Sequence, residues 1–339
     1  MGSVKDTHII RPTSDRIPGY GMFTFSDRYS VFDWGEMPDL IHDKGQALCT
    51  IGLYFFKQLE KYGVRHHCLG VLSGADLLSY DDLQQPDNNF TFSLLKVVKP
   101  EVRNGWYDYS AYQNLKSNYL IPLEVIYRNT LPKGSSVFRR IEEGSLSLAS
   151  MGLSEAPVPG QRLQRPIVEV STKLESIDRY ITWEEAREIS GLSTAEIDQL
   201  KETTLTINDI ITKESAKAGL LNEDGKIEFG FDRDRNLVVV DILGTPDECR
   251  FTRKDLPVSK EILRQHYRST PWHQEVEAAK KRDAIHWKKL VASAPPKLPD
   301  EIVILASSLY KACCNEITGR QWFDVPPLEN ILEKFDREA

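Results

Sequence analysis

The segment Lys226–Asp241, KIEFGFDRDRNLVVVD, has the pattern of a β-hairpin and decides how we interpret the rest of the chain. Two runs rich in β-branched and aromatic residues flank the polar turn DRDR. In the first run, Lys226 and Glu228 alternate with apolar residues, so both side chains point to one face of the strand. A polar face on a strand with an apolar reverse side indicates a site on a half-buried sheet.

The pairing within this hairpin predicts which charged groups meet. If Phe231 pairs with Asn236, Lys226 lies opposite Asp241, and Glu228 becomes a diagonal neighbour of Asp241. Diagonal pairs lie roughly 7–8 Å apart at the backbone, within reach of long side chains. Two carboxylates and an ammonium suit Mg²⁺ and the phosphates it bridges, because Mg²⁺ takes few protein ligands together with substrate oxygens. A cross-strand salt bridge on a solvated face explains the same pattern, so geometry alone leaves both interpretations open.

A second polar segment, Tyr127–Arg140 (YRNTLPKGSSVFRR), has the composition of a phosphate site. Glycine lets the backbone approach an anion, Ser135 and Ser136 supply hydroxyls, and arginines such as Arg128 bind phosphate oxygens in pairs. The segment is not a P-loop, because the Gly-x-x-x-x-Gly-Lys-Ser/Thr pattern is absent from the sequence. A cationic surface turn is the alternative. Further on, TPDECR predicts a turn at Asp247 that brings Arg250 near the hairpin.

The segment Phe25–Gln46, FSDRYSVFDWGEMPDLIHDKGQ, mixes charged and aromatic residues and is interrupted by glycine and proline. A helix is predicted from Lys44, with apolar residues at spacings of three and four. The N–H groups at Gly45 and the charge of Lys44 would form a positive helix end that attracts an anion. We therefore expect a substrate-binding loop, whose polar candidates are Asp27, Arg28, Ser30 and Asp33.

Composition limits the class of protein. The chain has 339 residues, of which 40% are hydrophobic, and a formal net charge of −7, which argues against a nucleic-acid binder. Five cysteines without a Cys-x-x-Cys spacing indicate reduced thiols. The sequence shows neither a secretory leader nor an apolar run of about 18 residues. We expect a cytoplasmic protein without membrane contact, and the sequence leaves a homo-oligomer open.

The order of predicted elements indicates an α+β fold in two lobes. A strand at Tyr119–Asn129 is expected to be broken by Pro122 and to cross between lobes. Residues 145–165 are predicted as a long loop, and capping boxes at Thr182 and Ser193 open two helices. After the hairpin we expect helices only. The predicted division is residues 1–121, 122–268 and a helical extension at 269–339.

These segments together resemble the SAICAR synthetase (phosphoribosylaminoimidazole-succinocarboxamide synthase) family, in a divergent, archaeal-like form. FSDRYSVFD with the later Lys-Gly, RNTLPKGSS, STKLESIDRY, KIEFG with PDECR, and SKEILRQ resemble blocks of that family and occur in its order over about residues 1–268. The resemblance implies a two-lobed fold related to ATP-grasp and kinase-like architectures. It also implies an ATP-dependent carbon–nitrogen ligase that requires Mg²⁺ and joins L-aspartate to carboxyaminoimidazole ribonucleotide (CAIR) in purine biosynthesis.

The resemblance also implies roles for individual residues. For catalysis it implies Lys226 and Asp247, for the metal Glu228 and Asp241, and for ATP Lys5, Pro122, Leu123 and Lys226. For the ribonucleotide phosphate it implies Arg128, Ser135, Ser136 and Arg250. The remaining substrate candidates are Asp27, Arg28, Ser30, Asp33, Lys44 and Gly45.

The chain departs from the family pattern at two places. Ser3 stands where the family has a lysine near the ATP phosphates, and Lys5 stands where it has an arginine. Ile242 follows the candidate metal ligand Asp241 where the family often has an acid, so the metal site would have one ligand fewer. These departures leave two alternatives, which are a paralogous ligase acting on another azole carboxylate and a catalytically silent nucleotide-binding protein. The retained charged pairs argue against the silent protein.

Overall fold

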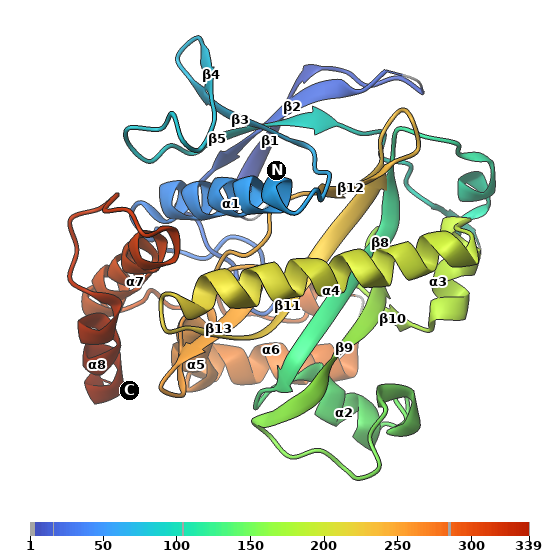
Figure 1. Ribbon diagram of the computed structural model, residues 1–339. Coiled ribbons are helices and arrows are strands. Elements are labelled where there is room, and N and C mark those ends of the chain that lie inside the picture. The colour runs from blue at the N-terminus through green and yellow to red at the C-terminus, as the bar shows by residue number, and fades with distance from the viewer. Residues whose placement is uncertain (1–3, 16, 104, 284–285, 339) are drawn as a thin grey trace.

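The fold is described by a computed structural model, which covers residues 4–15, 17–103, 105–283 and 286–338. Ser3 lies outside the described residues. Two antiparallel sheets form the body of the molecule, and helix α1 lies between the five-stranded sheet and the larger sheet (Figure 1). Among the described residues, no helix combines the length and the apolar content needed to cross a bilayer.

The five-stranded sheet comes from the first part of the chain. Its strand order is β1 (Lys5–Arg11), β2 (Gly19–Phe25), β5 (Asn89–Leu94), β3 (Cys68–Ser73) and β4 (Asp76–Leu78). Helix α1 (Lys44–Lys61) begins where the sequence predicts it, and its apolar side Leu48, Ile51, Phe55 and Leu59 is buried. A small hairpin of β6 (Glu101–Arg103) and β7 (Trp106–Asp108) and the 3-10 turn η1 (Ser110–Asn114) follow.

The larger sheet carries most of the charged residues of interest. Its order is β10 (Tyr180–Ile181), β9 (Gln161–Thr172), β8 (Tyr119–Leu131), β11 (Leu221–Phe231), β13 (Cys249–Arg253) and β14 (Leu256–Pro257), and β12 (Leu237–Val240) also pairs with β11. Helix α4 (Thr194–Ala216) runs across β8 and β11 in Figure 1. Around the sheet lie α2 (Ser136–Glu142), η2 (Ala149–Met151) and α3 (Trp183–Ser190).

The two sheets are joined through their backbones. The amide of Val239 on β12 donates to the carbonyl of Arg65, and the amide of His67 donates to the carbonyl of Val239, each at 2.9 Å. The amide of Leu120 on β8 donates to the carbonyl of Lys96, also at 2.9 Å. Because backbone hydrogen bonds fix register and spacing, the first residues of β8 and the end of β12 have defined positions beside the five-stranded sheet.

The hairpin forms, but its predicted register is wrong by one residue. Phe231 pairs with Leu237, and Glu228 pairs with Val240. The turn is one residue longer than expected, because Asp232 and Asn236 close it. The amide of Asp232 donates to the carbonyl of Asn236 at 3.0 Å, and the side chain of Asp232 accepts from the amide of Asn236 at 2.8 Å. A shift of one residue would turn Asp241 to the opposite face, but Asp241 follows the end of β12 with a φ of 61°, which redirects its backbone.

Three further expectations need correction. Strand β8 runs unbroken through Pro122, and Pro122 lies at an irregularity in its pairing with β11, between the pairs that Glu124 and Leu120 make. This placement suits a residue without an N–H group. The chain after the hairpin is not only helical, because β13 and β14 extend the larger sheet. The predicted loop at 145–165 contains η2 and the start of β9.

The predicted helix starts are supported by their caps. Ser193 and Glu196 form a complete capping box at α4, whereas at α3 only the Thr182 hydroxyl accepts from the amide of Glu185. The chain ends in α5 (Glu261–Arg268), α6 (Pro271–Arg282), η3 (Trp287–Lys289), α7 (Asp300–Thr318) and α8 (Leu328–Glu338). The division of the chain at residues 121 and 268 stays a prediction.

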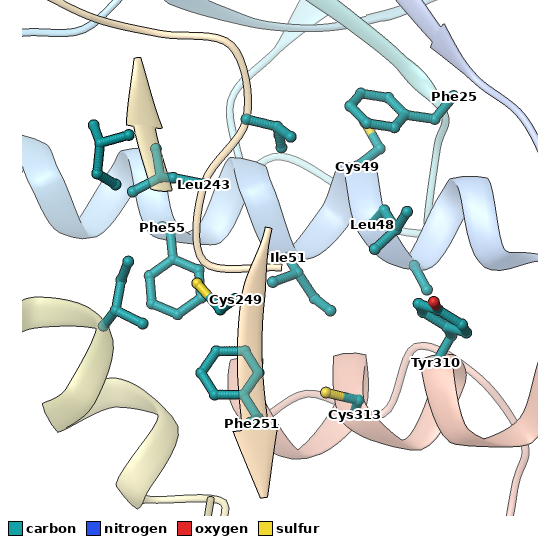
Figure 2. Packing of buried hydrophobic residues seen from close by; sticks show 14 of the residues in the cluster. Phe25, Leu48, Cys49, Ile51, Phe55, Leu243, Cys249, Phe251, Tyr310 and Cys313 are labelled. Atoms are coloured by element: carbon teal, nitrogen blue, oxygen red, sulfur yellow. The ribbon is translucent and has the colours of Figure 1, made fainter. Parts of the chain in front are cut away.

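The core around α1 fixes the turn that carries Asp247. Figure 2 shows Phe251 of β13 and Tyr310 and Cys313 of α7 on the same side of α1, the side to which Ile51 and Phe55 point. After β12 the chain passes so close to α1 that a Cβ at Gly244 would lie 2.2 Å from Cδ2 of Phe55, and Gly244 has a φ of 71°. Only glycine suits such a position, so the path from β12 to residues 246–250 is defined.

Candidate active site

A mainly apolar cavity of about 290 Å³ lies where the two sheets meet. We call it the apolar cavity. Its wall comes from β1, β2, β5, β8 and β12 and the segments beside them, and its charged members are Lys5, Lys173, Glu228 and Asp241. The apolar part is formed by Phe23, Phe92, Leu94, Leu95, Val97, Leu120 and Val240. Such a lining suits a flat heterocycle with a charged group at its end.

A cluster of charged side chains lies on one face of three adjacent strands. Glu124 of β8 is paired directly with Glu228 of β11, and Lys226 is two residues away on the same face. Two carboxylates in direct register repel each other, so cations are needed beside them. Lys226 Nζ lies 3.0 Å from Glu124 Oε1, and Lys173 Nζ, just after β9, lies 2.5 Å from Glu228 Oε1.

The same cluster extends to Asp241 and Glu248. Lys5 of β1 forms an ion pair with Asp241, and Lys226 Nζ lies 3.7 Å from Glu248 Oε2. Burial and the charge of Asp241 raise the pKa of Glu228 to about 7. Burial would also raise the pKa of Asp241, but Lys5 and Lys173 outweigh it and lower that pKa to about 2. The two carboxylates that the sequence pairs are therefore electrostatically linked.

A second cavity, of about 280 Å³, adjoins this cluster and is densely charged. We call it the polar cavity. Its cations are Arg128, Lys226, Arg250, Lys260 and Arg264, and its acidic residues are Glu124, Asp178, Asp224, Asp247 and Glu248. Burial lowers the pKa of Lys260. Cations and acids are equal in number, so the cavity suits a ligand that carries an anionic group beside polar or cationic ones.

Arg128 is buried and already surrounded by partners. Its side chain is 1% exposed, and its guanidinium contacts Glu169 at 2.5 Å and Asp224 at 3.2 Å. Its Nη2 atom donates to the hydroxyls of Ser136 at 3.3 Å and Tyr180 at 2.9 Å. These contacts fix the guanidinium plane at the cavity wall, so Arg128 both supports the site and lines it.

The other residues considered for phosphate binding differ in their exposure and in their partners. Arg250 lies across from Arg128 on β13 and contacts Asp224 at 3.0 Å with a side chain that is 27% exposed. Ser135 caps α2, and its hydroxyl accepts from the amide of Val137 at 3.4 Å. Arg140 stacks on the ring of Tyr180 at 3.8 Å and contacts Glu169 at 2.7 Å. Arg250 is thus more accessible to a ligand than Arg128.

Asp247 lines the polar cavity from the turn before β13. Its Oδ2 atom lies 2.7 Å from Nζ of Lys44, a side chain with no exposed surface. Burial opposes ionisation of Asp247, but Lys44 and Lys260 outweigh it and lower its pKa to about 2. The amide of Gly45 donates to Oδ1 of Asp27 at 3.1 Å, so the start of α1 already has an anionic partner.

The remaining candidates in the Phe25–Gln46 segment do not contribute to the described linings of the two cavities, although the charge of Asp33 acts on Asp178 in the polar cavity. Arg28 contacts Asp6 of β1 at 2.8 Å, and Asp33 lies 3.4 Å from Lys280 of α6. Neither these residues nor Ser30 appear in the linings of the two cavities within the described part of the chain. Pro122 and Leu123 follow Leu120 on β8, which lines the apolar cavity.

Several lining residues had no role assigned from the sequence. Lys173 and the pair Lys260 and Arg264 belong to segments that resemble the family, and that resemblance was the available signal. Glu248 likewise lies in the PDECR block. The position of Glu124 beside the cluster follows from the pairing of β8 with β11. Within the described residues, no group of three or more acidic, histidine or cysteine side chains is arranged for a metal ion.

The α+β fold carries two adjoining cavities that share one charged cluster, an arrangement suited to an enzyme that joins two ligands. The SAICAR synthetase family model matches residues 2–279. The chain belongs to this family. The predicted family, α+β fold class and ligase class are confirmed by this match and by the relatives below.

Curated relatives cover nearly the whole chain. A protein of Archaeoglobus fulgidus, named provisionally as phosphoribosylaminoimidazole-succinocarboxamide synthase, is 49% identical over 334 residues, which are 98% of each chain. The synthase of that name from Thermoplasma acidophilum is 33% identical over 309 residues, covering 89% of this chain and 94% of the relative.

Solved structures show the same fold at lower identity. SAICAR synthase from Saccharomyces cerevisiae, complexed with SAICAR, superposes with a TM-score of 0.66 at 22% identity and covers 95% of this chain and 94% of its own. A SAICAR synthetase in complex with ADP gives a TM-score of 0.56 at 23% identity, covering 88% of this chain and 99% of its own.

Proposed function

We propose that this chain joins L-aspartate to the carboxylate of CAIR, forming SAICAR while ATP is converted to ADP and phosphate. The observation that carries the proposal is the charged cluster, whose members Lys173 and Glu228 line the apolar cavity while Lys226 lines the polar cavity. A nucleotide phosphate and a substrate carboxylate would meet there. The SAICAR and ADP complexes of proteins with the same fold support both ligands.

The reaction needs an activated carboxylate. A carboxylate oxygen of CAIR attacks the terminal phosphorus of ATP, and the bond from that phosphorus to the bridging oxygen breaks. ADP departs as the leaving group, and CAIR becomes an acyl phosphate. The amine of aspartate then attacks the carbonyl carbon, and phosphate departs with the bonding electrons. Phosphoryl transfer depends mainly on positioning and on cations near the moving charge. Burial opposes the charge on Lys226, but the carboxylates of Glu248 and Glu124 outweigh it and hold the pKa of Lys226 well above its ordinary value, so it stays a cation.

ATP would occupy the apolar cavity. Its base would pack among side chains such as Phe92 and Leu120, and the adjacent Pro122 and Leu123 would lie beside it. Lys5 and Lys173 would then contact the phosphates, which also compensates for the serine at the family's lysine position. A charged residue that is already in position in the free protein loses little conformational freedom when the ligand binds.

Glu228 and Asp241 fit a Mg²⁺ site. Glu228 is buried and Asp241 is partly buried, both face the same cavity, and each is paired with a lysine that a phosphate could take over. Mg²⁺ accepts one or two carboxylates together with phosphate oxygens and water. When bound, the ion would neutralise charge on the transferring phosphoryl group. Ile242 offers no further oxygen side chain, so the two carboxylates would be the whole acidic set.

The ribonucleotide would bind in the polar cavity. Arg128, with Ser135 and Ser136 beside it, and the more exposed Arg250 would hold its phosphate. Lys260 and Arg264, which lie one helical turn apart at the start of α5, are available for a carboxylate. Paired guanidinium donors match phosphate geometry.

The attacking amine must lose a proton. Asp178 lines the polar cavity, and partial burial of its carboxylate with the charge of Glu124 raises its pKa to about 6. A carboxylate with that pKa is matched to the role of a general base near neutral pH. Asp247, with its low pKa, would accept a hydrogen bond from a substrate amine, and Lys44 would hold it. For Asp27, Arg28, Ser30, Asp33 and Gly45 we propose that they shape the segment around Lys44.

The test is steady-state release of ADP with Mg²⁺, CAIR and L-aspartate, with each omitted in turn and SAICAR detected by mass. Release that requires all three supports the proposal. Release with a different azole carboxylate but not with CAIR would identify a paralogous ligase, and absence of ATP binding would indicate a silent protein. The cytoplasmic location, the absence of nucleic-acid and membrane partners, and a homo-oligomer stay predictions.

A further inference from the structure

Asp247 is held from two sides, and one side comes from the C-terminal part of the chain. The hydroxyl of Tyr310 donates to Oδ1 of Asp247 at 2.7 Å, while Lys44 contacts the other oxygen at 2.7 Å. Tyr310 lies on α7, beyond residue 279 where the family match ends. A residue outside the family match therefore contacts a carboxylate that lines the polar cavity.

The three groups form a buried arrangement around the carboxylate of Asp247. Tyr310 is 1% exposed, Lys44 has no exposed surface, and the side chain of Asp247 is 8% exposed. Burial and the charge of Asp247 hold the pKa of Tyr310 well above its ordinary value, so Tyr310 keeps its proton and acts as the donor. A hydrogen bond to a charged group is stronger where water is excluded.

Helix α7 is fixed to the start of α1 by contacts on the same face as Tyr310. The hydroxyl of Ser307 donates to the carbonyl of His42 at 2.7 Å, and Nζ of Lys311 lies 2.7 Å from Asp43. Positions three and four apart lie on one side of a helix. Figure 2 shows Tyr310 rising from its helix towards Leu48 on α1. The hydroxyl therefore has a fixed approach to the turn that carries Asp247.

We propose that Tyr310 is a positioning residue for the ligation reaction, which acts by fixing the carboxylate of Asp247 in the polar cavity. The inference rests on the proposed function. The C-terminal segment of this chain then contributes to the reaction, because Asp247 has Lys44 as one partner and receives its second partner, Tyr310, from α7. Two partners on two oxygens fix the carboxylate plane, whereas one ion pair would leave it free to rotate.

The experiment compares Tyr310→Phe with the wild type and with Tyr54→Phe. Tyr54 is a matched control, because its buried hydroxyl donates to the carboxylate of Glu214 away from both cavities. Tyr310→Phe is expected to lower kcat/KM for aspartate or CAIR by about tenfold to a hundredfold, the range for loss of a hydrogen bond to a charged group. KM for ATP should stay unchanged. Tyr54→Phe should keep the wild-type kinetics.

A double-variant cycle separates positioning from a general loss of structure. In the Asp247→Asn background, Tyr310→Phe should cause no further loss, because the group through which it acts has been changed. Losses that multiply in the double variant, or a Tyr310→Phe enzyme with the kinetics of the Tyr54→Phe control, would overturn the proposal.

A measurement without turnover keeps this inference separate from the proposed function. If the wild type releases no ADP with CAIR and aspartate, the proposed reaction fails, and reductive methylation of Lys44, read by peptide mass, then decides the positioning. Lys44 should be protected in the wild type and in Tyr54→Phe and become labelled in Tyr310→Phe, because its partner can then move. Equal protection in all three proteins would overturn the role of Tyr310.

Discussion

The apolar cavity and the polar cavity share the Lys226–Glu228 segment of β11, yet they are built by different means. The apolar cavity is lined mainly by side chains from both sheets that pack as a core would, and its charges gather in one cluster. More than half of the residues that line the polar cavity are charged, and they neutralise one another or charges just behind the wall, as Arg128 does with Asp224 and Glu169.

This difference determines how each cavity responds to mutation. Apolar linings tolerate small changes of shape, because each contact contributes little. In an ion-pair network, loss of one member leaves its buried partners uncompensated. The following changes test the contrast, from the largest expected effect to the smallest.

The shared cluster should be the most sensitive part. Glu228→Gln keeps the size of the side chain and removes a charge that two lysines contact. We expect kcat to fall by about a thousandfold, the upper range for loss of one electrostatic group in an active site. The measurement is ADP release at saturating substrates. Glu223→Gln, on the same strand, is the matched control and should retain turnover. Equal losses of kcat in both variants would show that Glu228 has no specific role in the reaction.

Within the polar cavity, Arg128→Ala should show how much the ion pairs of Arg128 contribute to the stability of the fold. Two buried carboxylates would lose a partner, and we expect the free energy of unfolding to fall by about 3–5 kcal/mol. Thermal or urea unfolding measures the loss. Arg139→Ala is the control, since its side chain is 71% exposed and its pair with Glu143 spans 3.9 Å. A stable Arg128→Ala protein would show that the network is not needed for folding.

A smaller effect is expected at the solvent-facing side of the polar cavity. A base must be deprotonated to act, so with a pKa of about 6 at Asp178 kcat should rise with pH up to about 6 and level off above it. Asp178→Asn should lower the plateau by about a hundredfold and remove that rise. The pH profile of both proteins is the measurement. An unchanged pH profile in Asp178→Asn would mean that a group other than Asp178 accepts the proton of the attacking amine.

The smallest effect is expected in the apolar cavity. Val97 lines it but is 49% exposed, so Val97→Ala removes two methyl groups from the wall without opening the core. We expect KM for ATP to rise by about threefold, in keeping with roughly 0.8 kcal/mol per buried methylene, and kcat to stay unchanged. Val102→Ala, 64% exposed on β6, is the control. A large loss of kcat would contradict the contrast between the cavities.

The sequence predicted those features that depend on neighbouring residues. Helix α1 begins at Lys44 and α4 at its capping box, because periodicity and caps are local properties. The family blocks identified Arg128, Lys226, Glu228 and Asp241, which all line the two cavities.

Features that depend on distant pairings were not predictable in the same way. The hairpin register depended on the side chain of Asp232, which lengthens the turn by one residue. Glu124 faces Glu228 only because β8 pairs with β11 across a long sequence separation. Tyr310 reaches Asp247 only because α7 packs on α1. Each of these contacts requires the folded arrangement of elements that the sequence pattern does not specify.

The network around Arg128 has a consequence for the end of each catalytic cycle. Three guanidiniums, those of Arg128, Arg140 and Arg250, face the two carboxylates of Glu169 and Asp224, which leaves one net positive charge. A phosphate monoester carries nearly two negative charges at neutral pH. The substrate and product of the proposed reaction carry the same phosphate, so this group favours neither. Partial neutralisation of the arginines keeps the attraction moderate, and the product can leave.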